Sequence, residues 1–420
     1  MARNFRIARA LRHRNYRLFF AGQSTSLIGT WLTKFATAWM AYRLTGSAFM
    51  LGLVAFFSNA PTSLLAPIAG VLVDRWNRRR TIVITQIFAL AQSAALAVFA
   101  LAGWMTVWHL MVLGAVQGVI NAFDMPARQS FLRELIEDKA DLPNAIALNS
   151  SMVNVAKLVG PVLAAALVGL FGEGWCFAID AASYLAVIAS LLAIRVTSPA
   201  PPIARAPVLA QLVEGVRYAA GTPLVRAILV LLAVTSVLAG AYTSMLPVVA
   251  AEHLSGGAYT LGILMASGGL GALSGALYLA NRTTVVGLGG VIANTGLALG
   301  TGLLALELAP TVWIAAPLLF IVGLSLMVQM AATNTIIQTV VEPSMLGRVI
   351  SLYAVAFSGG MPLGAFLEGS IASQLGAVNT LAAAGVLVLV ASLVFRRALP
   401  ALRRASRARY IELGLIKSVP

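Results

Sequence analysis

The stretch that decides the fold is GVLVDRWNRRR at residues 70–80, a charged turn between two long apolar runs. It holds one carboxylate, Asp74, and four arginines. Charges this dense are too costly to place in hydrocarbon, so the stretch predicts a water-facing connection between two membrane-spanning helices. A short turn rich in arginine is also typical of the cytoplasmic side of a membrane. On charge alone, an ordinary positive-inside loop explains the stretch equally well.

The composition indicates a polytopic membrane protein. Of 420 residues, 60% are hydrophobic and only 10% are charged, and the mean hydropathy is +0.90. A soluble domain has about a quarter of its residues charged. The net charge of +15 lies in the short connections and at the two ends of the chain, which favours contact with anionic lipid headgroups over nucleic acid. The single cysteine, Cys176, cannot form a disulfide within the chain.

Apolar segments of about 20 residues, the length that spans a bilayer, follow one another along the chain. They predict an all-α fold with twelve transmembrane helices, near 16–42, 49–73, 81–103, 107–125, 144–171, 174–195, 225–251, 259–280, 285–307, 312–334, 348–372 and 376–396. With both termini in the cytoplasm, 26 of the 29 lysines and arginines fall on the cytoplasmic side. Such a bias supports an even number of spans and cytoplasmic termini.

The segments divide into two halves. We expect a basic amphipathic segment at 1–15, a six-helix half at 16–195, a cytoplasmic linker at 196–224, a second six-helix half at 225–396 and a basic tail at 397–420. Gly70-Val-Leu-Val and Gly275-Ala-Leu-Tyr occupy equivalent places in the two halves, although Leu279 stands where the first copy has Asp74. A repeat of six plus six helices is typical of alternating-access transporters with a site near the bilayer midplane.

A family resemblance rests on several motifs. A glycine four residues before an Asp-Arg pair, followed by a basic cluster, resembles the loop between helices 2 and 3 of major facilitator superfamily transporters. The blocks at 11–48, 121–135, 144–161 and 346–369 are similar to the drug:proton antiporter branch, which includes macrolide exporters and the bacterial enterobactin exporter. The resemblance implies the major facilitator fold, export of an amphipathic drug or siderophore-like molecule, a bacterial inner membrane location and a monomer.

The resemblance also implies a cytoplasmic gating network that locks one of two states. Its members would be Asp74, Arg75 and Arg78 in the turn, with Asp124 and Arg128 at the end of the fourth helix. Asn77 replaces the second glycine that the family has in this turn, and asparagine tolerates a positive φ angle.

Ionisable residues inside the predicted helices are the best candidates for proton coupling, because they are expensive there. They are Asp180, Glu368, Lys34 and Lys157. We hypothesise that Glu368 or Asp180 takes up a proton from outside, with Lys157 or Lys34 as its counter-charge. The alternative is that all four form buried ion pairs or contact lipid headgroups.

Polar and aromatic side chains on the central helices are candidates for lining the substrate cavity, and bonding to neighbouring helices is the alternative for each. The candidates are Gln23, Trp31, Asn59, Gln117, Asn149, Asn154, Gln329 and Asn334. In the fifth helix, Gly160 and Pro161 predict a kink, and a Gly-Pro pair there is associated with exporters in the superfamily. Asn144 is expected to cap the start of this helix.

Motifs for enzymes, cofactors and metals do not occur. There is no HExxH, no Walker loop and no cluster of cysteine and histidine. We therefore expect a proton-coupled exporter that is not an enzyme, whose partners are a small-molecule substrate, protons and membrane lipids. Two alternatives stay open: a symporter or facilitator that imports a metabolite, and a membrane protein that moves lipid or does not transport.

Overall fold

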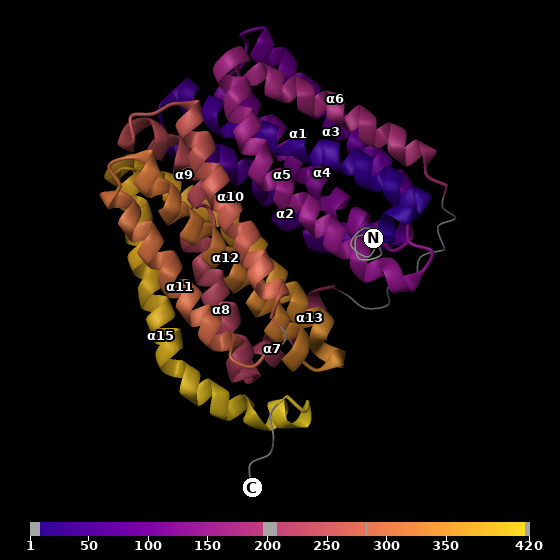
Figure 1. Ribbon diagram of the computed structural model, residues 1–420, viewed down its shortest axis with the longest axis vertical. Helices are drawn as coiled ribbons and strands as arrows, with labels where there is room; N and C mark the ends of the chain where they lie inside the picture. Colours follow the sequence, from indigo (N-terminus) through magenta and orange to yellow (C-terminus); the bar gives the residue numbers. More distant parts are fainter. Residues whose placement is uncertain (1–8, 196–207, 283, 416–420) are drawn as a thin grey trace, which may run out of the picture. The chain divides into compact units, whose positions relative to one another are not determined.

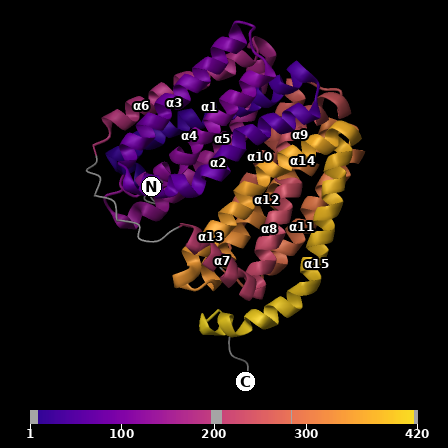
Figure 2. The same cartoon turned by 180° about the vertical axis from the view of Figure 1, so that it is seen from behind.

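The computed structural model describes residues 9–195, 208–282 and 284–415. For Pro67, Asp74, Lys139 and residues 208–212, only the backbone is described. Every regular element in these parts of the chain is helical (Figures 1 and 2). The chain forms two compact units. The N-terminal unit comprises Met1–Arg205 with Gly257–Gly262, and the C-terminal unit comprises Ala206–Gly256 with Ile263–Pro420.

The N-terminal unit contains six long helices. They are α1 (Arg14–Thr45), α2 (Ala48–Arg75), α3 (Arg78–Leu101), α4 (Val107–Leu132), α5 (Leu142–Phe171) and α6 (Glu173–Ala193). Helix α1 packs against α5 and α6, α2 packs against α4, and α3 packs against α4 and α6. Apolar side chains fill one end of this unit, among them Tyr16, Phe19, Ile82, Phe131 and Leu191.

Three of these helices begin at a side-chain cap. Ser47 caps α2 and Thr106 caps α4. Asn77 has a φ of −68°, so the expected use of a positive φ is wrong. Its side chain instead caps α3, because Oδ1 accepts the Arg80 amide at 2.9 Å. Asparagine satisfies an orphan amide at a helix start in this way.

The beginning of the chain and the start of α5 differ from the predictions. Residues 1–8 of the expected amphipathic segment lie outside the described residues, and Arg9–Arg12 form a single 3-10 turn before α1. Helix α5 begins at Leu142, with Pro143 in its first turn. Asn144 is therefore already inside the helix and is not its cap. Its Oδ1 accepts the Ala10 amide at 2.9 Å, which ties the 3-10 turn to α5.

The C-terminal unit is built from nine helical segments and short connecting turns within the described residues. The helices are α7 (Val208–Gly221), α8 (Pro223–Ala239), α9 (Tyr242–Val248), α10 (Ala258–Ala280), α11 (Leu288–Ala305), α12 (Val312–Val340), α13 (Pro343–Ala354), α14 (Gly360–Leu375) and α15 (Ala377–Glu412). Helix α11 packs against α12 and α15, and α8 packs against α14 and α15. Their shared core includes Val225, Ile292, Ile336 and Phe395.

Two predicted spans are not continuous α-helices. The segment expected at 225–251 is α8 followed by a break at Gly240 and Ala241, then α9 and a π-helical turn at Val249–His253. The segment expected at 348–372 is α13 and α14 joined by a π-helical turn at Val355–Gly359. Hydropathy detects the length of a span but not these changes of helical hydrogen bonding.

The helices have the length and composition of membrane spans. In the described residues, 11 helices or helical runs are long and apolar enough to cross a bilayer. Helix α1 has 32 residues and supplies the remaining long helix of the predicted twelve. Large apolar side chains lie on the outside, including Trp104 at 67% and Trp313 at 74% exposure. Tryptophan near helix ends is typical of the membrane interface. The chain is a polytopic α-helical membrane protein.

Candidate functional site

A buried ion pair lies at the end of the N-terminal unit that carries the 75–80 turn. Asp124 in α4 pairs with Arg128 one turn later. The Oδ1 atom of Asp124 accepts Thr85 Oγ1 at 2.8 Å and Gln86 Nε2 at 2.9 Å, both from α3. Arg128 also donates to Gln23 Oε1 in α1. These bonds join three helices around one carboxylate.

The arginines of the turn have different partners. Arg78 pairs with Glu134, just past the end of α4, and Arg79 donates to the Leu191 carbonyl of α6 at 2.9 Å. Arg75 is exposed and makes no ion pair with any carboxylate whose side chain is described. The predicted gating residue Asp74 has a side chain outside the described residues. Glu134 was not predicted as a member of the network. It lies far from the basic turn along the chain, and no sequence pattern links the two.

A second carboxylate at the same end of the unit gathers three basic residues. Asp141, just before α5, lies 2.8 Å from Arg9, 2.8 Å from Arg12 and 3.0 Å from His13. We call these four residues the Asp141 clasp. Burial acts to raise the pKa of Asp141, but the hydrogen bond with His13 and the charges of Arg12, Arg9 and His13 outweigh it, so the pKa lies below its ordinary value of 3.8. The clasp holds the start of α1 to the start of α5.

Asp180 lies inside the membrane-spanning part of α6. Its Oδ2 accepts Thr33 Oγ1 of α1 at 2.7 Å and Ser93 Oγ of α3 at 3.0 Å. Its Oδ1 is buried without a hydrogen-bond donor among the described residues. Gly29 makes room for it, because a Cβ at Gly29 would lie 2.6 Å from Oδ1. Two neutral hydroxyls, rather than a lysine, therefore hold the carboxylate.

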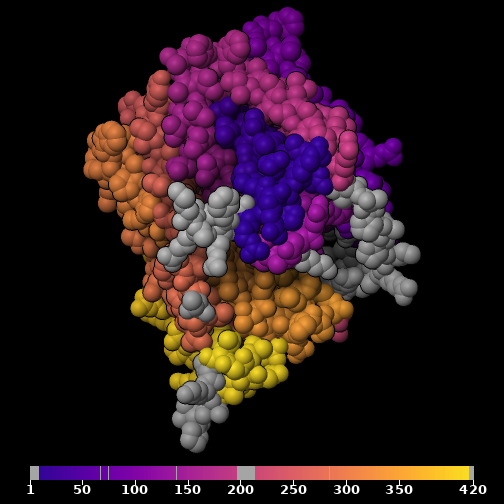
Figure 3. Space-filling view, turned by 45° about the vertical axis from the view of Figure 1, so that its right-hand side comes forward, coloured from indigo at the N-terminus to yellow at the C-terminus, as the bar shows by residue number. Residues whose placement is uncertain are grey.

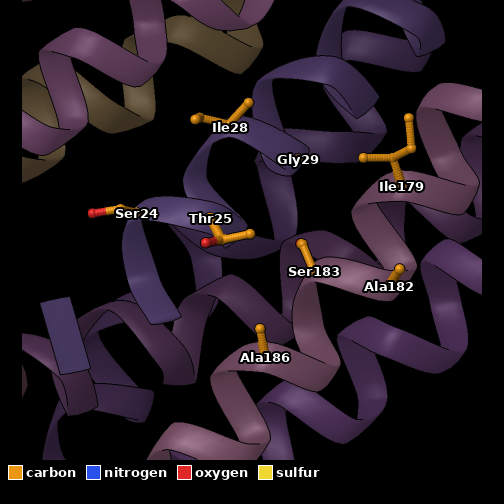
Figure 4. A pocket seen from close by; sticks show the side chains of 8 residues that line it. All are labelled: Ser24, Thr25, Ile28, Gly29, Ile179, Ala182, Ser183 and Ala186. Atoms are coloured by element: carbon orange, nitrogen blue, oxygen red, sulfur yellow. The ribbon is translucent and has the colours of Figure 1, made fainter. Parts of the chain in front are cut away.

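A groove of about 450 Å³ runs beside Asp180 between α1 and α6 (Figure 4). Four residues from each helix line it: Ser24, Thr25, Ile28 and Gly29 from α1, and Ile179, Ala182, Ser183 and Ala186 from α6. In Figure 3, the indigo residues near the N-terminus reach the surface of the unit beside its magenta helices. The groove is mainly apolar, and the hydroxyls of Ser24 and Thr25 bond back to carbonyls of α1.

The predicted counter-charges are not paired with carboxylates in the described part of the chain. Lys34 Nζ lies 4.6 Å from the centroid of the Trp31 ring, a cation–π contact within α1. Lys157 lies in α5, which packs against α1. Neither lysine forms an ion pair with Asp180 or with another described carboxylate. The expected lysine–carboxylate pairs are therefore absent from this structure.

The Gly160-Pro161 pair is buried inside α5, and the helix continues through it to Phe171. A Cβ at Gly160 would overlap with Trp31 Cβ of α1. The pair thus lets α5 and α1 approach closely, and the missing amide of Pro161 does not end the helix.

The C-terminal unit has one buried carboxylate in a span, Glu368 of α14. It is 4% exposed, and neither carboxylate oxygen has a hydrogen-bond partner among the described residues. Helix α12 carries three further buried polar side chains at four-residue intervals, Ser325, Gln329 and Thr333, whose polar atoms also lack partners in the described structure.

Comparison with known proteins decides the family. Residues 8–412 match the family described as transmembrane secretion effector, a family of the major facilitator superfamily. The chain belongs to this family. Its members are transport proteins and not enzymes, as the sequence predicts.

Relatives and solved structures agree with this membership. The chain is 24% identical to macrolide efflux protein A of Streptococcus pyogenes, over 91% of this chain and 96% of the relative. It is 25% identical to the enterobactin exporter of Escherichia coli, over 93% of both chains. A bacterial homologue of the human lysosomal transporter Spinster, in an inward-facing and unoccupied conformation, has the same fold with a TM-score of 0.69, 15% identity and coverage of 94% of this chain and 98% of that one.

Several of the polar cavity candidates make hydrogen bonds within their own helices. Asn59 and Asn154 donate to the carbonyls four residues earlier at 2.8 and 2.9 Å. Gln117 donates to Asn121, and Asn334 accepts from Gln338, at 3.1 and 3.2 Å. Asn149 is half-buried, and Gln23 belongs to the Arg128 cluster. The described residues include no group of three His, Cys, Asp or Glu that could hold a metal ion.

Proposed function

We propose that this protein is a proton-coupled exporter of an amphipathic small molecule, working by alternating access as a monomer in a bacterial inner membrane. The efflux and export functions named for its bacterial relatives support the direction of transport. The fold it shares with a solved transporter supports alternating access. The positive charges of the connections and ends support cytoplasmic termini and contact with anionic lipids.

The observation that carries proton coupling is a carboxylate without a counter-ion inside a span of each unit. Glu368 has no hydrogen-bond partner among the described residues, and Asp180 has only two hydroxyls. An ionised carboxylate without a counter-charge is unfavourable inside a membrane. Binding a proton removes that cost, and releasing it restores the cost. A conformational change that exposes either carboxylate to water on one side would therefore couple proton movement to transport.

We further propose that the charged turn and the end of α4 act as the cytoplasmic gate. Its residues are Asp74, Arg75, Arg78, Asp124 and Arg128, now extended by Glu134, Gln23 and the Asp141 clasp. The two transport halves would be residues 16–195 and 225–396, joined by the linker at 196–224. Ion pairs at helix ends can break and re-form as the halves change state, which suits a switch rather than a substrate site.

The test uses everted membrane vesicles with an imposed pH gradient and two fluorescent probes, ethidium and carboxyfluorescein. We expect the wild type to accumulate at least one probe in a gradient-dependent manner. Glu368→Gln and Asp180→Asn should each reduce that dependence by about tenfold or more, as expected when a residue of proton transfer is removed. Glu307→Gln is the matched control, because Glu307 is exposed in the turn after α11.

The outcomes separate the alternatives. Full gradient-driven uptake by both Glu368→Gln and Asp180→Asn would refute the assignment of these carboxylates. Equilibration of a probe that ignores the pH gradient in the wild type would indicate a facilitator. Loss of uptake in Asp74→Asn, with normal amounts of protein in the membrane, would support the gating role of the turn.

A further inference from the structure

Two lysines on neighbouring membrane-spanning helices form no ion pair with any carboxylate whose side chain is described. Lys157 lies at the middle of the 30-residue α5, and Lys34 lies past the middle of the 32-residue α1. A residue near the middle of such a helix is about 20 Å from either end, so Lys157 cannot reach a lipid headgroup by extending its side chain. Lysine at this depth is costly and is a functional feature by default.

The two lysines flank one contact between α1 and α5. The helices are in direct contact, and Gly160 packs against Trp31. Lys157 is one turn before Gly160 on α5, and Lys34 is one turn after Trp31 on α1. Lys34 is exposed and Lys157 is half-buried.

None of the acidic side chains that the structure describes in this unit pairs with Lys34 or Lys157. Asp124 pairs with Arg128, Glu134 with Arg78, and Glu173 with Arg43. Asp138 and Asp141 pair with basic residues before α1. Asp180 accepts two hydroxyls, and Glu137 is exposed on the connection after α4. The π face of Trp31 compensates only part of the charge of Lys34.

We propose that Lys34 and Lys157 bind the anionic group of the transported molecule, so that the substrate is an amphipathic organic anion. This inference rests on the proposed transport function and specifies its substrate class. Two ammonium groups facing one ligand match a carboxylate or sulfonate, because charge-assisted hydrogen bonds are the stronger ones. A bound anion also removes the repulsion between the two lysines, so charge complementarity adds to the affinity. A cationic drug would meet the opposite effect at this site.

The test measures binding at constant pH, without a gradient. The purified full-length protein is placed in nanodiscs of phosphatidylcholine, so that no anionic headgroup competes. The probes are 2-naphthoate, the neutral 2-naphthamide and the cationic 2-naphthylmethylammonium, which share one aromatic body. We expect 2-naphthoate to bind about tenfold to a hundredfold more tightly than 2-naphthamide, the range for hydrogen bonds to charged groups. The ammonium probe should bind most weakly.

The variants decide whether the lysines are responsible. The double variant Lys34→Gln/Lys157→Gln should lose the preference for 2-naphthoate, and Lys34→Arg/Lys157→Arg should keep it. Arg404→Gln, an exposed arginine of α15, is the control for loss of a single positive charge. The arginine double variant shows that the fold tolerates substitution at both positions.

Each result has one meaning. Equal binding of 2-naphthoate and 2-naphthamide by the wild type, including no binding of either, overturns the anion site. A preference that survives in the glutamine double variant also overturns it. Adding phosphatidylglycerol to the nanodiscs shows whether lipid headgroups take the site: competition with 2-naphthoate would assign it to lipid. Because no pH gradient is used, failure of proton coupling in vesicles leaves this binding result interpretable.

Discussion

Buried polar side chains are treated differently in the two units. In the N-terminal unit, each buried polar side chain with an atom that lacks a partner has another polar atom that is bonded, as in Gln23, Arg128 and Asp180. In the C-terminal unit, five buried side chains make no hydrogen bond at all among the described residues. These are Ser325, Gln329, Thr333, Glu368 and Ser392.

The two units differ in the free-energy cost of their buried polar groups. A buried group without a partner costs about 1–3 kcal/mol, so native proteins keep few of them. In the N-terminal unit, buried polar groups form bonds that hold helix ends together. The C-terminal unit holds polar groups whose partners must be a proton, a water molecule, a ligand or a different arrangement of helices. We therefore expect substitution of the bonded buried groups of the N-terminal unit to lower stability more than substitution of the unpartnered buried groups of the C-terminal unit.

The largest effect should come from opening the Asp124–Arg128 pair. Arg128→Gln leaves Asp124 buried, at 3% side-chain exposure, without its counter-charge, which costs about 3–5 kcal/mol. The thermal unfolding of the purified protein should shift strongly to lower temperature. Arg404→Gln, which removes an exposed arginine, should change stability by less than about 0.5 kcal/mol. Similar melting of the two variants would contradict the structural role of the pair.

Two glutamines, each 1% exposed, test the comparison directly. Replacing each by leucine should change the stability of the protein in different directions. Gln23→Leu removes the acceptor of Arg128 and should destabilise the protein by about 1–3 kcal/mol. Gln329→Leu removes a buried amide without partners, and should be neutral or stabilising by a similar amount. Thermal unfolding of both variants measures the difference. Destabilisation by both would show that Gln329 has a partner in the folded protein, such as an internal water molecule.

The contact between α5 and α1 should be sensitive to a single methyl group. Gly160→Ala forces a Cβ against Trp31 and should cost about 1–3 kcal/mol by overpacking. Gly70→Ala is the matched control on α2, because a Cβ there meets nothing within 4 Å. Chemical unfolding of both variants provides the measurement. If Gly70→Ala were the more harmful, crowding would not explain the glycine of α5.

The smallest effect concerns the Asp141 clasp and acid pH. Since the pKa of Asp141 is lowered in the folded protein, the unfolded chain binds the proton more readily. The clasp therefore contributes its full stability above the ordinary pKa of about 3.9 and loses it as the pH falls through the lower folded value. Unfolding rates between pH 6 and pH 3 should rise more steeply in the wild type than in Asp141→Asn. Parallel profiles would show that the clasp does not titrate in this range.

Sequence patterns predicted those features of this molecule that depend on residues close together in the chain. Asp124 and Arg128 are four residues apart on one helix, and that spacing brings side chains together. The partner of Arg128, Gln23, is 105 residues away, and no spacing rule connects them. Twelve spans follow from hydropathy, but the π-helical turn at Val355–Gly359 depends on backbone hydrogen bonding that apolar residues do not encode.

The role expected for the lysines shows a second limit of prediction from sequence. The cost of a charge in a membrane predicts that Asp180 has a partner, but it does not predict which one. Thr33 and Ser93 fill that place with neutral hydroxyls, and hydroxyl groups are too common in the chain to be singled out. The lysines are consequently left without a carboxylate partner among the described residues, which the sequence does not predict.

The π-helical turn at Val355–Gly359 rotates the residues after it around the helix axis relative to the residues before it. A hydrogen bond from residue i to i+5 adds about one residue to a turn, and one residue corresponds to about 100° of rotation. In a cysteine-labelling scan, accessibility should vary with the helical period in both α13 and α14. The labelled face of α14 should be rotated by about a quarter of a turn from the one that α13 predicts. A helical wheel drawn straight through 343–375 would assign Glu368 to the wrong face, so sites in α14 must be counted from Gly360 and not from Pro343.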